Sequence, residues 1–102
     1  MRLFVFYDLP ITKKEESKEA NMFRKKLIRY GFVMMQYSIY VKFCLNYDHL
    51  NKYVLLVKEI LPKKGNIRIL KITDNQYQSM EVILGEKNQD EENIKDSYLE
   101  II

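Results

Sequence analysis

The stretch FVMMQYSIYVKFCL, residues 32–45, decides how this chain folds. Apolar residues alternate with more polar ones across it, and a period of two is typical of a β-strand. Its fourteen residues exceed the usual strand length of about 3–10 residues, so we expect a bend or tight turn at residues 36–38. The stretch therefore predicts two consecutive strands in the middle of the chain.

The segment before this pair predicts a strand followed by a helix. Residues 3–7 are a near-continuous apolar run, which is typical of a central strand covered on both faces. Thr12 and Glu15 suit a capping box that opens a helix, and Gly31 is a natural residue to end it. The apolar side chains at core spacing in this helix are Ala20, Phe23, Leu27 and Tyr30.

The segment after the pair predicts a second helix and more strand. Asn46 or Asp48 can cap this helix, and Pro62 stops it. Residues 67–73 and 79–86 then predict two further strands. The order is β-α-β-β-α-β with an additional strand.

This order predicts an α+β fold of the ferredoxin-like kind, in which two helices cover one face of a four-stranded antiparallel sheet. The expected domain spans residues 1–85. Its last strand, residues 80–84, should pair with a second copy in a homodimer, because an unpaired apolar edge strand is a liability.

Charge is distributed unevenly along the chain. Residues 1–85 carry 15 basic and 8 acidic side chains, whereas residues 86–102 carry 2 basic and 6 acidic ones. A basic domain followed by an acidic tail suggests a polyanionic partner for the domain, although the excess of basic residues also suits simple solubility. The tail ends in apolar residues, so it either docks on another protein or is a frayed terminus.

Composition excludes several classes of protein. No run approaches the roughly 20 apolar residues of a membrane span, and we expect a soluble, cytoplasmic protein without a secretory signal. Cys44 is the sole cysteine and has no nearby Cys or His with which to hold zinc. His49, the sole histidine, is expected to be structural or solvated.

Motifs of common catalytic classes are absent as well. The sequence has no Gly-rich phosphate loop, no Ser-His-Asp set and no Cys-His pair. Asp8 remains: it follows the first apolar run and precedes Leu9 and Pro10, although Asp is depleted in strands. It serves either the turn, by bonding backbone N–H groups, or chemistry.

Four segments resemble the small CRISPR-associated adaptation proteins, partners of the larger integrase subunit in spacer acquisition. They are VFYDLP (5–10), YGF (30–32), QYSIYV (36–41) and TDNQYQSMEVILGE (73–86). The resemblance covers nearly the whole chain as far as Glu86. Members of that family are dimeric and ferredoxin-like; some were assigned metal-dependent endonuclease activity on RNA or DNA, and others bridge two integrase dimers around a short DNA duplex.

The resemblance implies that Asp8 is the catalytic residue and a metal ligand, with Mg²⁺ as the expected cofactor. One carboxylate is too little for Mg²⁺, which takes six oxygen ligands, but a two-fold dimer supplies Asp8 twice. The metal would lower the pKa of a bound water and stabilise charge on the scissile phosphate. Since no base is visible, a non-catalytic scaffold bridging integrase dimers around duplex DNA is the alternative function. A small-molecule-binding regulator is a third class.

Several cations are candidate contacts to the phosphates of a nucleic acid, which they would grip without reading bases. Lys13 and Lys14 are the strongest candidates, because they follow the first strand closely. Three others share a face of the predicted helix, namely Lys18, Lys25 and Arg29. The last is Lys42, which is expected on the polar side of its strand. Each could equally be an ordinary solvated residue.

Overall fold

The computed structural model describes residues 1–85, and the acidic tail lies outside the described residues. Both the docking of that tail and the domain boundary after residue 85 therefore stay predictions. In chain order the elements are β1 (Arg2–Asp8), α1 (Lys14–Arg29), β2 (Val33–Gln36), β3 (Ile39–Phe43), α2 (Tyr47–Glu59), β4 (Asn66–Ile72) and α3 (Asp74–Gln78).

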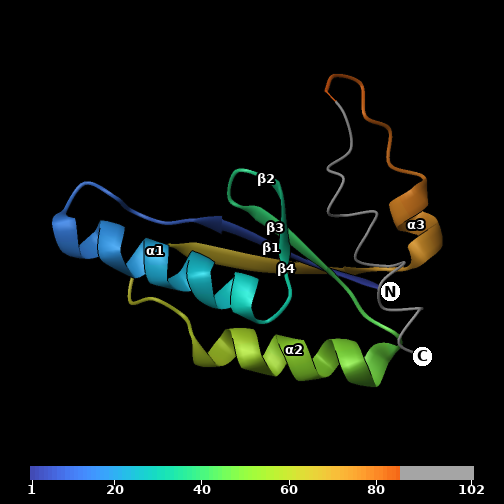
Figure 1. Ribbon diagram of the computed structural model, residues 1–102, viewed down its shortest axis with the longest axis horizontal. Helices are drawn as coiled ribbons and strands as arrows, with labels where there is room; N and C mark the ends of the chain where they lie inside the picture. The colour runs from blue at the N-terminus through green and yellow to red at the C-terminus, as the bar shows by residue number, and fades with distance from the viewer. Residues whose placement is uncertain (86–102) are drawn as a thin grey trace.

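The four strands form one antiparallel sheet in the order β2-β3-β1-β4. The first strand is thus central, as its near-continuous apolar run predicts. Figure 1 shows α1 and α2 on the same side of this sheet. The predicted ferredoxin-like arrangement is confirmed. None of the helices within residues 1–85 is long and apolar enough to cross a membrane.

The main core lies between the sheet and the two long helices. Leu3 and Val5 of β1 pack there against one apolar face of each helix. Burying each large apolar side chain contributes about 1.5–3 kcal/mol, so this layer holds the sheet and helices together. The buried helix residues are Phe23 and Leu27 of α1 and Leu50, Val54 and Val57 of α2.

The helix ends are fixed by local hydrogen bonds. At α1 the prediction is wrong by one residue: the backbone N–H of Lys13 donates to the Glu16 carboxylate (2.9 Å), and so does the Thr12 hydroxyl (3.0 Å). At α2 the predicted cap is confirmed, because the Asn46 side chain accepts from the His49 N–H (2.9 Å). Gly31 has a φ of +93° where the chain leaves α1, a conformation that favours glycine.

The predicted break in the long β segment is confirmed. Tyr37 and Ser38 form a tight turn between β2 and β3. Ser38 has a φ of +64°, and its carbonyl accepts from the Tyr7 N–H of β1 (3.0 Å). The turn is therefore held against the central strand rather than left free.

The second face of the sheet carries a smaller apolar cluster. Phe4 and Val41 are buried there with Tyr77 of α3, and partly buried residues surround them: Phe6, Val33, Met35, Ile39, Ile72 and Met80. In Figure 1, α3 lies at the end of the sheet away from the start of α1. The long helices leave this face uncovered, so the short α3 is its only helical cover within residues 1–85.

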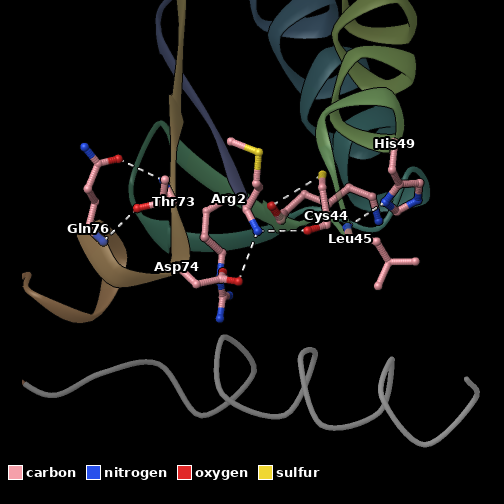
Figure 2. Close-up of polar contacts among 9 residues, drawn as sticks. Arg2, Cys44, Leu45, His49, Thr73, Asp74 and Gln76 are labelled. Carbon is pink, nitrogen blue, oxygen red and sulfur yellow. Dashed lines mark hydrogen bonds and ion pairs between the residues drawn. The ribbon is translucent and has the colours of Figure 1, made fainter.

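The short helix α3 was not predicted from the sequence; it occupies residues 74–78, between the two strands predicted at 67–73 and 79–86. Thr73 and Gln76 form a reciprocal capping box with bonds of 2.8 and 3.1 Å (Figure 2). Asp74 lies 3.5 Å from the guanidinium of Arg2. That guanidinium is stacked over the ring of Tyr77, 4.1 Å from its centroid. A five-residue helix is thus stabilised by a residue far away in the sequence, which local patterns cannot show.

The additional strand predicted over residues 79–86 is not seen in its described part, residues 79–85. Residues 79–85 belong to no helix or strand. Val82, Ile83 and Leu84 are exposed, since no strand within residues 1–85 pairs with them. Pairing of this segment with a second copy remains a prediction.

Candidate functional site

Asp8 is the last residue of β1, and its side chain is exposed. In the antiparallel register it is paired directly with Asn66, the first residue of β4. No other described residue forms a hydrogen bond or ion pair with its carboxylate. The interpretation that Asp8 bonds backbone N–H groups of the turn therefore gains no support, and the carboxylate is free for a ligand.

An open hollow of about 490 Å³ surrounds Asp8. It brings together a carboxylate, the guanidinium of Arg68, the amide of Asn66 and the hydroxyl of Ser38. The register of β1 and β4 explains why these side chains lie together: Asp8 is opposite Asn66, and Arg68 is opposite Phe6. The remaining lining residues are Phe6, Tyr7, Tyr37 and Ile39.

Gly65 fixes the backbone beside Asp8. It has a φ of +115°, and a Cβ atom placed on it would lie 2.8 Å from the Asp8 carbonyl oxygen and 2.6 Å from the Leu9 Cδ2. Any side chain would therefore displace the turn that presents Asp8, in addition to the strain of the positive φ. The loop before β4 and the loop after β1 are thus packed as one unit.

Tyr7 lines the hollow but is held by the core. Its ring stacks on Tyr40 (centroids 5.9 Å apart) and meets Phe23 edge-on (5.2 Å). Burial, reinforced by the neighbouring Tyr40, raises the pKa of Tyr7 to about 12. Its phenol therefore stays protonated at physiological pH and is a poor general base.

The metal-ligating groups within residues 1–85 are too few for a site in one chain. No three His, Cys, Asp or Glu side chains among them are placed to hold a metal ion. Cys44 is buried, and the Nδ1 atom of His49 accepts from the Leu45 N–H (3.1 Å). Of the structural or solvated role expected for His49, this hydrogen bond favours the structural one. A cation at Asp8 would need ligands from water, substrate or a second copy.

The predicted phosphate contacts separate into two groups. Lys13 is exposed in the loop that follows β1, where it lines a small cleft of about 140 Å³ with Lys63 and Lys64 of the loop that follows α2. Its neighbour Lys14 begins α1 and is exposed. The others lie exposed along α1: Lys18, Lys25 and Arg29. Because α1 covers the sheet face opposite to the one shared by Phe4, Phe6 and Asp8, the structure does not bring these last three residues to Asp8.

The prediction that Lys42 projects from a polar side of its strand is wrong. Lys42 faces the helices, and only 9% of it is exposed. Its ammonium lies over the Tyr53 ring, 4.4 Å from the centroid, and next to Gly31 at the end of α1. Alternation along β3 hides it beneath the helix layer, so a phosphate cannot reach it.

Of the residues that line the hollow, only Asp8 was predicted from the sequence as a site residue; Tyr37, Ser38, Asn66 and Arg68 were not. The sequence predicted the turn and the fourth strand that carry them, but not the register that sets β4 against β1. Had the register been known, the pairing of Asp8 with residue 66 would have identified Asn66 as a neighbour of Asp8. It would also have identified Arg68, because residues two apart in a strand lie on the same face.

Comparison with known proteins agrees with the fold. The model of the family described as "CRISPR associated protein Cas2" matches residues 1–80. A "CRISPR-associated endoribonuclease Cas2" of Ligilactobacillus salivarius is 42% identical over 87 residues, covering 85% of this chain and 86% of the relative. The proteins of the same name from Treponema denticola and Flavobacterium psychrophilum are each 40% identical, over 84% and 83% of this chain and 85% and 74% of their own lengths.

Proposed function

The chain belongs to the CRISPR associated protein Cas2 family, and we propose that it is a metal-dependent endonuclease acting on RNA or DNA at Asp8. The observation that carries this proposal is the exposed carboxylate of Asp8, unbonded within the described chain and set in a hollow beside Arg68. The relatives are named as endoribonucleases, which favours RNA as the first substrate to test.

A homodimer is the proposed active form. The uncovered sheet face carries the partly buried apolar side chains of Phe6 and Ile39, and Leu70 on the same face is 47% exposed. An apolar surface of this kind favours association with another protein surface, and a two-fold contact uses the same patch on both copies. Asp8 lies on this face at the end of β1, so two copies joined there can bring both Asp8 side chains to the axis.

The proposed cofactor is Mg²⁺ or a similar divalent cation. Two Asp8 carboxylates and the Asn66 amide oxygens are the hard ligands that Mg²⁺ prefers, with waters completing its six positions. Bound there, the ion would supply an activated water and neutralise charge on the phosphate. Asp8 would hold the ion, and Arg68 would contribute a fixed positive charge in the hollow.

The test is metal-dependent cleavage of labelled RNA by wild type and by Asp8→Asn. Asn keeps the shape of the side chain but removes the charge that a cation needs, so cleavage should fall at least about 100-fold, since metal ions supply several kcal/mol of stabilisation. Asp48→Asn, which removes an exposed carboxylate at the start of α2, is the matched control. Undiminished cleavage by Asp8→Asn would refute the site.

The second candidate function is a scaffold that holds duplex DNA for the larger integrase subunit. The exposed cations along α1 favour it, because they lie away from Asp8 and would contact phosphates without taking part in chemistry. Spacer acquisition by Asp8→Asn separates the two functions. Acquisition that persists without cleavage would identify a scaffold, and loss of both would make the chemistry essential.

A further inference from the structure

We propose that Arg68 and Tyr37 are substrate-binding residues of the Asp8 hollow. Arg68 binds the phosphate at the bond to be cleaved, and Tyr37 stacks on an unpaired base next to that phosphate. The proposal rests on the proposed function at Asp8 and adds to it the residues that hold the substrate.

Arg68 is an exposed cation of the hollow without a partner among the described residues. It is exposed, and no described residue forms an ion pair, hydrogen bond or ring contact with it. It is paired with Phe6 in the register and lies two residues from Asn66, the partner of Asp8. Arginine binds phosphate through two parallel N–H bonds, and Arg68 lines the same hollow as Asp8.

Tyr37 is an aromatic residue kept out of the core by a rigid turn. It is 90% exposed and has no ring contact within the described chain. The next residue, Ser38, has a φ of +64° and is tied to β1 through the Tyr7 N–H (3.0 Å). A ring presented in this way loses little conformational freedom when it stacks on a ligand, and exposed aromatic rings are the usual platforms for unpaired bases.

The hollow has the size and the chemistry for one nucleotide. Its volume of about 490 Å³ falls in the range of roughly 300–1,000 Å³ of small-ligand sites. A base on Tyr37 and a phosphate on Arg68 would set the next bond against Asp8. Inside a duplex both faces of a base are already stacked on its neighbours, so the site selects unpaired strands.

The experiment measures binding in the Asp8→Asn background, where cleavage does not consume the probe. A labelled single-stranded RNA and a blunt duplex of the same sequence are titrated with Tyr37→Ala, Tyr37→Phe, Arg68→Gln and Arg68→Lys. Tyr47→Ala and Lys58→Gln change an exposed aromatic and an exposed cation on α2, away from the hollow, and serve as matched controls.

Tyr37→Ala should weaken single-strand binding roughly ten-fold and leave duplex binding unchanged, and Tyr37→Phe should keep the affinity. Arg68→Gln should weaken single-strand binding and lower its salt slope by about one, with partial rescue by Arg68→Lys. In the active background, Tyr37→Ala should raise KM more than it lowers kcat.

Two results would overturn the proposal. One is that Tyr37→Ala and Arg68→Gln both bind the single-stranded RNA with an affinity within two-fold of that of the matched controls. The other is a shift of either variant from dimer to monomer in analytical ultracentrifugation, which would assign these residues to the contact between copies. The binding assay does not depend on cleavage. If Asp8 proves not to be the cleavage site, the measured affinities of the Tyr37 and Arg68 variants still decide whether these residues bind the substrate.

Discussion

Lys42 lies within β3 and Lys13 lies in the loop after β1, and their surroundings give them different roles. Lys42 is buried over the Tyr53 ring, and burial lowers the pKa of its ammonium. Lys13 is exposed at the loop that follows Asp8. Exposure, rather than charge, decides which of the two can contact a phosphate.

This difference predicts opposite effects on nucleic-acid binding. Changing both Lys13 and Lys14 to Gln should weaken duplex binding about equally across sequences and reduce the salt slope by roughly one to two. Lys42→Met, which keeps the apolar stem, should leave affinity and slope unchanged. Filter binding over a series of salt concentrations measures both. A loss of affinity in Lys42→Met with the fold intact would contradict the burial argument.

At the scale of elements, the loops around Asp8 depend on Gly65. Its Cβ would meet the Asp8 carbonyl and the Leu9 side chain, so the ends of β1 and β4 cannot both keep their places once a methyl group is added. The same two loops carry Lys13, Lys63 and Lys64. The geometry of the site is therefore a property of a loop pair and not of Asp8 alone.

Gly65→Ala should lower the free energy of unfolding by more than the roughly 1 kcal/mol that a positive φ costs alanine, and it should lower cleavage as well. Gly85→Ala is the matched control: Gly85 has a φ of +95°, but no atom of residues 1–85 lies within 4 Å of a Cβ placed on it. Chemical denaturation of both variants measures the difference. Equal losses would show that the loop contacts do not matter.

His49, near the start of α2, predicts that the stability of the fold depends on pH. Burial, aided by the charges of Lys42 and Lys52, lowers the pKa of His49 from its ordinary 6.5, and the neutral ring accepts from Leu45 N–H. The unfolded chain then binds a proton first as pH falls below about 6.5, so the contribution of His49 to stability is present above that pH and is lost below it. Its imidazole NMR signals should titrate below 6.5, and a midpoint above that value would contradict the contact.

The elements also show how far sequence reasoning reaches. The period of two in residues 32–45 and the weak turn within it were sufficient for β2 and β3, since alternation is a local property. Asp8 could be singled out because an acid at the end of an apolar strand is unusual. Lys42 was misplaced because alternation does not say which face the helices cover, and α3 was missed because Arg2 stabilises it from the other end of the domain.

At the scale of the whole molecule, the uncovered sheet face is where a second copy should bind. Leu70 is on this face, and Leu55 on α2 is even more exposed (61%) on the helix side. Leu70→Glu should therefore produce monomers, because a charge in a buried apolar contact is costly, whereas Leu55→Glu should leave the dimer intact. Light scattering after size-exclusion chromatography gives the mass of each. A dimer that survives Leu70→Glu would place the contact elsewhere.

The proposed function requires that two copies share one metal ion through their Asp8 side chains. The most direct test is the stoichiometry of Mn²⁺ binding, measured by electron paramagnetic resonance. Mn²⁺ is used here as a spectroscopically visible substitute for Mg²⁺. The wild type should bind one ion for every two chains, and Asp8→Asn should bind none at this site while remaining a dimer. One ion per chain, or binding that persists in Asp8→Asn, would contradict the claim.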